Sequence, residues 1–284
     1  MWIGDDAAIV AAPATLLLAA DLVVAGVHAD LALTGVDDLG WKAIAVNVSD
    51  LAAMGGRPLH ALVTVAGPPG TDLDALYRGI ADASRFYRCP VVGGDLANAG
   101  VLAVSVAVTG TTDGRPPILR SGARPGDRLF VTAALGAAAA GLRELRSGAV
   151  PPDGAPNARA HARPLALVAE GAAAREGGAT AMIDVSDGLA ADIGHLAEQS
   201  GVGVALDRAR VPVAPGATFE EAWSGGEDYQ LVFAAPDEAS VDAAFTAAGL
   251  PVPASIGVCT QDRDERSLDG SPWPGGSQGW EHDW

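Results

Sequence analysis

Short apolar runs rich in β-branched residues occur along the whole chain, and segments of helical periodicity lie between them. The runs expected to form strands are Ala14–Ala25, Leu59–Ala66, Leu102–Thr109, Arg128–Thr132, Ala181–Val185, Val202–Leu206, Gln230–Ala234 and Ala254–Val258. Strands and helices do not follow one another in strict β-α-β order. The pattern therefore predicts an α+β protein rather than one doubly wound parallel sheet.

Helical periodicity is clearest in two long segments. In VDDLGWKAIAVNVSDLAAMGG, the side chains of Trp41, Ile44 and Val48 share one face, and the closing Gly-Gly pair ends the helix. The segment TDLDALYRGIADASRFYR repeats this pattern behind a Thr-Asp start. Further helices are expected at Gly136–Leu145, Arg159–Arg175, Gly188–Ser200 and Pro236–Ala248.

A change in composition marks a boundary near the middle of the chain. The stretch TGTTDGRPPILRSGARPGDRLF is rich in Gly, Pro and Arg and follows a clear strand pattern. We therefore expect two domains, residues 1–115 and residues 116–284, each of mixed α and β structure. The Pro- and Gly-rich tail contains Trp273, Trp280 and Trp284, which either pack on the body of the protein or cover a flat ligand.

Charge and cysteine content exclude several classes of protein. The formal net charge of −17 disfavours nucleic-acid binding through a basic surface, and an anionic ligand would need cations as intermediaries. Cys89 and Cys259 are the only cysteines, so neither a disulfide framework nor a cysteine zinc site is expected. The start MWIGDDAAIV lacks the features of a secretory signal, and no apolar run is long enough to span a membrane. A cytoplasmic location is expected.

Many aspartates stand next to glycines or inside apolar runs. Examples are Asp5 and Asp6 in IGDDAAIV, Asp21 in LLLAADLVV, Asp50 in AVNVSDLAAMGG, Asp95 in VVGGD, Asp184 and Asp187 in IDVSDG, and Glu227 and Asp228 in SGGEDY. Buried acids need a partner, and Lys42 is the only lysine. Each acid by itself can also be explained by a structural role, as a helix cap, on a solvated helix face or in a turn. Together they indicate Mg²⁺ ions, which use few carboxylates together with phosphates and water.

The stretch Val91–Gly100 has both a structural and a functional interpretation. Gly93 and Gly94 either turn the chain, with Asp95 as a cap, or allow a ligand to approach the backbone while Asp95 holds a cation. The sequence has no P-loop, no G-x-G-x-x-G, no H-E-x-x-H, no G-x-S-x-G and no protein-kinase motifs. A phosphoryl-transfer enzyme of this sequence would therefore use metal ions and carboxylates rather than a lysine cradle.

Six sequence motifs together resemble those of a known family. GDDAA, KAIAVNVSDLAAMGGRP, VVGGD, LRSGARPGD, IDVSDGLAADIGHLAEQSG and SGGEDYQLVF occur in this order, and together they resemble the thiamine-monophosphate kinase family of the aminoimidazole ribonucleotide synthetase superfamily. The resemblance extends from Ile3 to Trp280. It implies two α+β domains, with N-terminal sheets that pair across a homodimer. It also implies that ATP phosphorylates thiamine monophosphate to thiamine diphosphate by in-line transfer, assisted by several Mg²⁺ ions.

The resemblance also assigns roles to individual residues. It places metal ligands at Asp6, Asp21, Asp50, Asp95, Asp184 and Asp187, ATP contacts at Gly94, Asp95, Arg120, Ser186 and Tyr77, and thiamine monophosphate contacts at His28, Glu227 and Trp280. No residue stands out as a general base. None is required, because a phosphate monoester is already largely deprotonated at neutral pH, so metal ions and positioning are expected to supply the rate.

Two departures from the family pattern bear on activity. Ala19-Ala20 replaces the usual hydroxyl residues before Asp21, which predicts weaker metal binding, and only Met1–Ile3 precede the GDD motif. Two alternatives stay open: another ATP-dependent enzyme of the superfamily with a different small substrate, and a nucleotide-binding paralogue with weakened catalysis. Replacing Asp50 or Asp95 by Asn is expected to abolish turnover without disturbing the fold.

Overall fold

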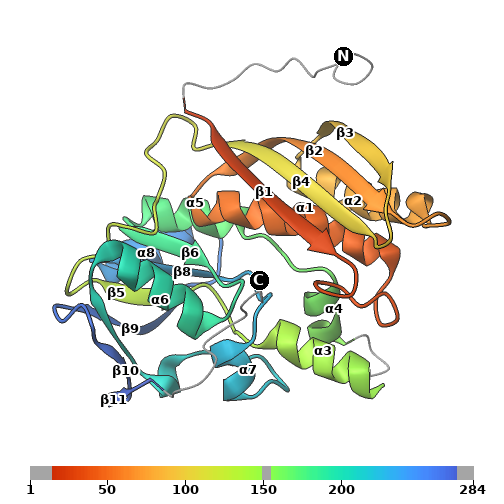
Figure 1. Cartoon of the computed structure of the whole chain (residues 1–284). Helices are drawn as coiled ribbons and strands as arrows, with labels where there is room; N and C mark the ends of the chain where they lie inside the picture. The colour runs from red at the N-terminus through yellow and green to blue at the C-terminus, as the bar shows by residue number, and fades with distance from the viewer. Residues whose placement is uncertain (1–14, 149–154, 274–284) are drawn as a thin grey trace. The chain divides into compact units, whose positions relative to one another are not determined.

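The computed structural model of the chain describes residues 15–148 and 155–273. Asp5, Asp6, Trp280 and Trp284, which the sequence analysis singled out, lie outside this described part. The chain divides into two compact units (Figure 1). Among the described residues, unit 1 comprises residues 15–51, 56–116 and 162–166, and unit 2 comprises residues 52–55, 117–148, 155–161 and 167–273.

Unit 1 is built on a four-stranded sheet with the strand order β1-β4-β2-β3. Its elements are β1 (Leu17–Val24), α1 (Val36–Ala53), β2 (Arg57–Gly67), α2 (Leu73–Tyr87), β3 (Val91–Asn98) and β4 (Ala103–Thr111). The β2 and β3 strands are parallel, while β4 is antiparallel to both β1 and β2. Figure 1 shows α1 and α2 together on one face of this sheet. Val63 and Val106 point towards that face and are buried.

Local signals in the sequence determine where α2 begins and ends. The Asp72 side chain accepts a hydrogen bond from the Ala75 N–H at 2.9 Å, which satisfies a donor that the first helical turn leaves unpaired. The helix ends at Arg88, whose φ of 53° is left-handed. Between these ends Leu76 and Ile80 are buried, so one apolar stripe of the helix packs inside unit 1.

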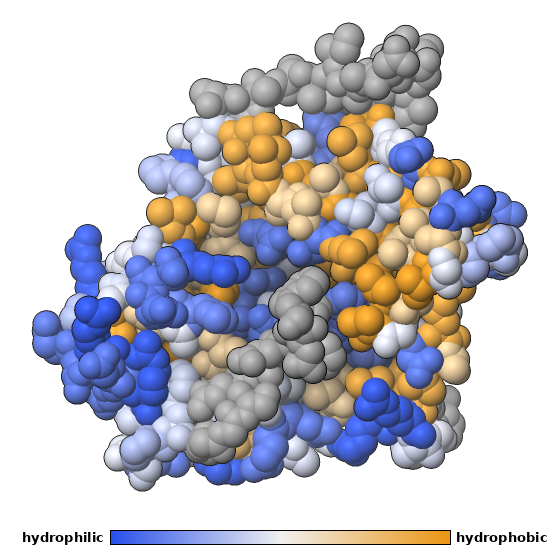
Figure 2. All heavy atoms as spheres, in the orientation of Figure 1, coloured by the Kyte–Doolittle hydropathy of each residue, from blue (hydrophilic) through white to orange (hydrophobic). Residues whose placement is uncertain are grey.

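The other face of the same sheet is apolar and open among the described residues. Leu18, Leu22 and Leu62 point to it and are 72%, 51% and 48% exposed. In Figure 2 orange side chains gather over the β1–β4 sheet. An apolar patch of this kind on a compact unit indicates an interaction surface.

The predicted helix Arg159–Arg175 is wrong, because the chain forms two helices there, α4 (Pro156–Ala162) and α5 (Val168–Glu176). Pro164 explains the interruption, since it has no N–H group and disfavours helical backbone at the residue before it. The residues between the helices pack in unit 1: Pro164 O accepts a hydrogen bond from Trp41 Nε1 at 2.8 Å, and Ala166 N–H donates to Tyr87 Oη at 2.9 Å.

Unit 2 contains a seven-stranded sheet with the order β11-β10-β7-β9-β5-β8-β6. Its strands are β5 (Arg128–Val131), β6 (Ala181–Asp184), β7 (Gly203–Leu206), β8 (Leu231–Ala235), β9 (Ala254–Thr260), β10 (Arg266–Leu268) and β11 (Ser271–Pro272). Besides α4 and α5, its helices are α3 (Ala137–Ser147), α6 (Leu189–Ser200), the short 3-10 helix Arg208–Arg210, α7 (Phe219–Ser224) and α8 (Glu238–Ala247).

Alternation along the strands gives this sheet two buried faces. Ile183 on β6 packs in a core cluster with Ile193 of α6, while its neighbour Met182 packs in a second cluster with residues of α5 and α8. In the second cluster the ring of Phe233 stacks on Phe130, with 5.2 Å between the ring centroids. Helices therefore cover both faces of this sheet, whose strands pair mostly antiparallel.

The strand β3 excludes one of the two interpretations of Val91–Gly100, the turn, while a ligand at this backbone stays a prediction. The strand continues through Gly93 and Gly94 to Asn98, so the prediction of a turn at this glycine pair is wrong. A Cβ atom added to Gly94 would lie 1.8 Å from the carbonyl oxygen of Val63 on β2, which explains why glycine is required there.

The helices of the described residues include none with the length and apolar character of a membrane span.

Candidate functional site

Two loops of unit 2 lie side by side and are joined by backbone hydrogen bonds. The first follows β6 and carries the IDVSDG motif, and the second connects α7 to β8 and carries the SGGEDY motif. The N–H of Glu227 donates to Ser186 O at 2.7 Å, and the N–H of Tyr229 donates to Val185 O at 2.8 Å. The two acidic motifs therefore form one structural site.

The close approach of these loops depends on small residues and on an unusual backbone. A Cβ atom on Gly226 would lie 2.5 Å from Ser186 O, so a larger residue would separate the loops. Glu227 and Tyr229 have φ angles of 68° and 51°, which are uncommon for residues other than glycine. Strained backbone of this kind is typical of functional loops, where neighbouring structure holds it in place.

A third acid, Asp192 on α6, supports the first loop from inside. Its Oδ2 atom accepts hydrogen bonds from the N–H groups of Asp187 and Gly188, each at 3.1 Å. The side chain is buried, and burial is the main reason that its pKa rises to about 8. The nearby carboxylates of Asp187 and Asp184 raise this pKa further, while the two N–H donors lower it.

Asp228 plays a comparable part for α3. Its carboxylate accepts hydrogen bonds from the N–H groups of Gly136 and Ala138, at the start of that helix. Burial raises the pKa of Asp228 to about 6, although its backbone donors act in the opposite direction. The Asp228 carboxylate therefore binds the loop to the start of α3. The carboxylate of its neighbour Glu227 has a different partner, His161.

Glu227 pairs with a buried histidine. Its Oε2 atom lies 3.2 Å from Nδ1 of His161 on α4. The His161 side chain is only 5% exposed, whereas the Glu227 side chain is 26% exposed. The carboxylate is thus reachable from solvent on one side and held by the imidazole on the other.

A cavity adjoins the first loop. Its volume is about 960 Å³, and its lining includes Asp187, Gly194 and His195 together with Arg266 and Trp273. This volume lies within the range of pockets for small molecules. Trp273 also packs edge-on against Trp223, with 5.2 Å between the ring centroids, so this member of the tryptophan-rich tail packs on the body of the protein.

In unit 1, His28 lies in a tight turn directly after β1. Its Nδ1 atom accepts a hydrogen bond from the Val24 N–H at 3.1 Å, so a neutral His28 carries its proton on Nε2. The His28 carbonyl accepts a hydrogen bond from the buried Nζ of Lys42 at 2.9 Å. The only lysine of the chain therefore supports this turn.

Asp21 and Asp50 belong to the same region of unit 1. The Asp21 N–H donates to Oδ1 of Asn47 on α1 at 2.8 Å, and Asp50 follows one helical turn after Asn47. Water reaches the Asp21 side chain, yet surrounding protein atoms desolvate its carboxyl group and raise its pKa, while His28 acts in the opposite direction.

Asp95 lies on the opposite side of the same sheet. In the register of the strands, Asp21 shares a row with Val106, Val63 and Gly94, whereas Asp95 shares a row with Thr64. Successive side chains alternate between faces, so Asp21 points to the helix-covered face and Asp95 to the open face. The two acids also lie on opposite edge strands, about 14 Å apart at three strand spacings. Within one copy of unit 1, the sheet does not bring them together.

The remaining predicted residues are more dispersed. Tyr77 lies on α2 and is 37% exposed, and burial of its hydroxyl raises its pKa. Arg120 has an exposed side chain, while its carbonyl accepts a hydrogen bond from Ser200 Oγ at 2.9 Å. Asp6 and Trp280 lie outside the described residues.

Mg²⁺ requires hard oxygen ligands, and the acidic side chains can supply them. In the described ranges, no group of three or more His, Cys, Asp or Glu side chains is placed to hold a metal ion. One pair of hard oxygen donors consists of Asp184, the last residue of β6, and Asp187 in the loop that follows, and both lie near enough to Asp192 to raise its pKa. Magnesium uses one or two carboxylates and completes its shell with phosphates and water, so these residues fit a nucleotide-linked Mg²⁺ ion better than a dedicated protein cage.

Sequence reasoning missed Asp192 and His161 and gave no role to Asp228. Asp192 has a recognisable signal, because an acid in the first turn of a helix often satisfies the N–H groups at the helix start. No comparable signal exists for His161, which is distant in sequence from Glu227 and meets it only through the fold.

Two family models match almost the whole chain. The model described as AIR synthase related protein, N-terminal domain matches residues 4–112, and the one for the C-terminal domain matches residues 124–269. The hydrogenase maturation protein HypE in complex with ATP has a TM-score of 0.74 at 20% identity, with 90% of this chain and 80% of that one covered, which shows a shared fold alone.

Similarity to thiamine-monophosphate kinases is much closer. The enzyme of Mycobacterium tuberculosis H37Rv is 38% identical over 98% of this chain and 84% of its own length, and that of Escherichia coli K12 is 34% identical over 99% and 91%. A solved structure described as AaThiL complexed with AMPPCP and TMP has a TM-score of 0.84 and 33% identity, covering 99% of this chain and 92% of that one. The chain belongs to the thiamine-monophosphate kinase family, within the AIR synthase-related superfamily.

Proposed function

We propose that this chain transfers the γ-phosphoryl group of ATP to thiamine monophosphate, giving thiamine diphosphate and ADP. The observation that supports this most directly is the pairing of the IDVSDG and SGGEDY loops through Glu227 N–H and Ser186 O. The first of these loops contributes Asp187 to the lining of a cavity of about 960 Å³, which is large enough for a small phosphorylated substrate. The pairing occurs in a chain that is similar in sequence and fold to a kinase solved with AMPPCP and TMP.

Mg²⁺ is the cofactor that the donor set fits. Several ions are proposed, and the described residues that would hold them are Asp184 and Asp187 in unit 2 and Asp21, Asp50 and Asp95 in unit 1, together with Asp6 outside the described part. Asp21 and Asp95 would hold different ions, because they lie on opposite faces of the sheet. When bound between protein and phosphates, the ion supplies positive charge that offsets the charge of two anionic substrates. This is how a chain with a net charge of −17 would accept ATP.

The protein residues contribute mainly position and charge. The phosphate monoester is already largely deprotonated at neutral pH, so the reaction does not require a general base. Gly94, Ser186, Arg120 and Tyr77 are the proposed ATP contacts, and His28, Glu227 and Trp280 are the proposed contacts of thiamine monophosphate. The anionic Glu227 carboxylate suits the positively charged thiazolium ring, and the Nε2–H of neutral His28 suits a phosphate oxygen.

We further propose that unit 1 pairs with unit 1 of a second copy through its open sheet face. Leu18, Leu22 and Leu62 on this face are largely exposed in the single chain, and a second copy would remove them from water. Asp95 lies on the same face, so this dimer would place both copies of Asp95 at the interface.

One assay tests the proposed reaction. Purified protein is incubated with Mg²⁺, ATP and thiamine monophosphate, and thiamine diphosphate and ADP are followed together. Equal amounts of both products are expected, and omission of thiamine monophosphate should reduce ADP release to background. ATP binding without thiamine diphosphate formation would contradict the proposal and indicate a different acceptor or a non-catalytic paralogue.

A further inference from the structure

The short helix α4 directs two buried polar side chains into unit 2 from positions one helical turn apart. The first is Asn157, whose Nδ2 donates to Glu144 Oε1 and to Pro215 O, each at 2.9 Å. The second is His161, whose Nδ1 lies 3.2 Å from Oε2 of Glu227. Residues four apart share a face of a helix, so Asn157 anchors the same face that presents His161.

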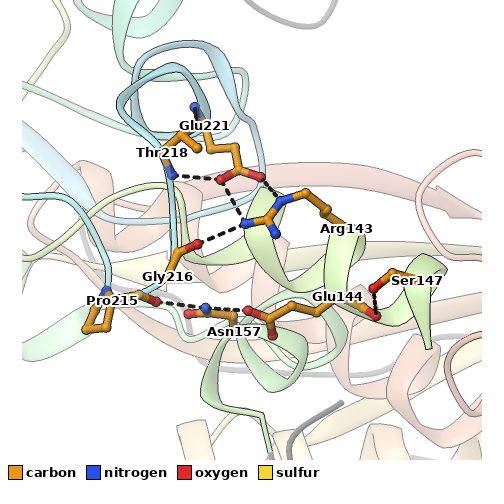
Figure 3. A network of polar contacts seen from close by, with 8 residues as sticks. All are labelled: Arg143, Glu144, Ser147, Asn157, Pro215, Gly216, Thr218 and Glu221. Carbon is orange, nitrogen blue, oxygen red and sulfur yellow. Dashed lines mark hydrogen bonds and ion pairs between the residues drawn. The ribbon is translucent and has the colours of Figure 1, made fainter. Parts of the chain in front are cut away.

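The anchor is part of a larger polar network between α3, α4 and α7 (Figure 3). Arg143 on α3 donates to the Glu221 carboxylate at 2.7 Å and to Gly216 O at 2.8 Å. Glu221 also forms a capping box with Thr218, which starts α7. Helix α7 leads directly into the Gly225-Gly226-Glu227 loop, so the network fixes both the helix that carries His161 and the helix that precedes Glu227.

Glu227 is thus held at two points. Its backbone is left-handed, with a φ of 68°, and its N–H is hydrogen bonded to Ser186 O at 2.7 Å. Its carboxylate is bound by His161 on one side and is partly open to solvent on the other. A glutamate side chain has several rotatable bonds, and a buried N–H donor restricts them to one orientation.

We propose that His161 is a positioning residue that orients the Glu227 carboxylate for thiamine monophosphate and thereby sets the affinity for this substrate. His161 is itself buried at the base of the pair, so it acts through Glu227 rather than by touching the substrate. The inference rests on the proposed contact between Glu227 and thiamine monophosphate. It predicts a selective effect, because the pair contributes to binding of the phosphate acceptor and not of ATP.

Steady-state kinetics of His161→Leu, His161→Asn, His161→Gln and Glu227→Gln test the proposal. His161→Leu removes the donor, and the KM for thiamine monophosphate is expected to rise about tenfold while the KM for ATP changes less than about twofold. His161→Asn places an amide N–H near the position of Nδ1 and is expected to restore most of this loss. His161→Gln carries the same group one carbon further out and should restore less.

A double-mutant cycle separates the positioning role from a general structural one. In the Glu227→Gln background, His161→Leu should add less than about a twofold further change, because the partner through which it acts is already altered. Asn157→Leu serves as a comparison, since it loosens the anchored face of α4 but keeps the His161–Glu227 pair itself. It is expected to lower the melting temperature and to raise the KM for thiamine monophosphate less than His161→Leu does.

Three results would overturn the inference: full additivity in the cycle, a KM effect of Asn157→Leu as large as that of His161→Leu, or equal KM values for His161→Asn and His161→Gln. If His161→Leu fails to fold by circular dichroism, the comparison of the Asn and Gln variants decides the matter, because both keep an amide. A different failure identifies the underlying proposal: if Glu227→Gln itself leaves the KM for thiamine monophosphate unchanged, then Glu227 is not a substrate contact.

Discussion

Asp192 Oδ2 accepts hydrogen bonds from the backbone N–H groups of both Asp187 and Gly188 at 3.1 Å, and so links the first turn of α6 to the loop before it. This places the Asp192 carboxyl group in a buried position beside Asp184 and Asp187. Burial and these two neighbours raise the pKa of Asp192 to about 8. The protein without Mg²⁺ therefore keeps a proton near neutral pH that an unfolded chain would release.

The first prediction concerns stability against pH in the absence of metal. An aspartate in the unfolded chain titrates near pH 4, so between about pH 4 and pH 8 the folded state binds more protons than the unfolded state. The free energy of unfolding should fall as the pH rises through this window, by at most about 1.4 kcal/mol per pH unit for one group. Urea unfolding in EDTA at several pH values between 6 and 8 measures the slope.

Asp192→Asn is the control for this assignment. Asn retains a carbonyl oxygen that can accept from the same N–H groups but has no titrating proton. The slope between pH 6 and 8 should then largely disappear, whereas the slope below pH 6 should remain, because Asp228 has a pKa raised to about 6. An unchanged slope above pH 6 would show that Asp192 is not the group responsible.

The sequence was most informative about the positions of the strands. Apolar runs predicted β1, β2, β4 and most strands of unit 2 within a few residues, because each of these strands has at least one apolar face packed in a core. The strand β3 was not predicted, because Gly-Gly is usually a turn signal. Here the signal comes from tight packing against Val63, a contact that is distant in sequence.

The candidate site was predictable as a list of acids but not as a geometry. Periodicity gives the face on which a side chain lies, yet it does not reveal that Asp21 and Asp95 occupy opposite faces and edges of one sheet, because strand order is not encoded locally. The same reason applies to the pair of Glu227 and His161. The break between α4 and α5 was different, since Pro164 was visible in the sequence and would have indicated it.

The second prediction uses the two adjacent glycines of β3. In Gly94→Ala the new Cβ would lie 1.8 Å from Val63 O, a backbone atom that cannot move without disrupting the β2–β3 pairing. In Gly93→Ala it would lie 3.1 Å from Leu62 Cδ2, the end of a flexible side chain. Gly94→Ala should destabilise the protein by about 3 kcal/mol and Gly93→Ala by less than about 1 kcal/mol, as measured by urea denaturation. Equal losses would contradict the packing argument.

The third prediction concerns the proposed metal ligands in unit 1. Asp50→Asn and Asp95→Asn each replace a charged oxygen ligand by a neutral amide, and kcat should fall by at least about 100-fold. The melting temperature without Mg²⁺ should stay within a few degrees of the parent value, because neither side chain belongs to the apolar core.

The exposed Asp74 on α2 offers a matched control, since Asp74→Asn makes the same chemical change on a surface to which no role has been assigned. This variant should keep the parent kcat and the parent dependence on Mg²⁺ concentration. If Asp50→Asn and Asp95→Asn both retained near-normal rates, the assignment of these acids to metal would be wrong.

The last prediction concerns the open face of the unit 1 sheet. Leu62 is 48% exposed there and lies in the same row of the sheet as Ala20 and Ala107, so Leu62→Asp adds a charge to an apolar surface without altering the core of the single chain. In a dimer through this face, that charge would be buried without a partner, and the dissociation constant should rise by at least about 30-fold.

Leu73→Asp is the control, because Leu73 is 38% exposed on α2, the helix layer that covers the other face. Sedimentation equilibrium should show a dimer for the parent and for Leu73→Asp and a monomer for Leu62→Asp. A parent chain that remains monomeric at tens of micromolar, or a Leu62→Asp variant that remains dimeric, would show that a second copy does not cover this face.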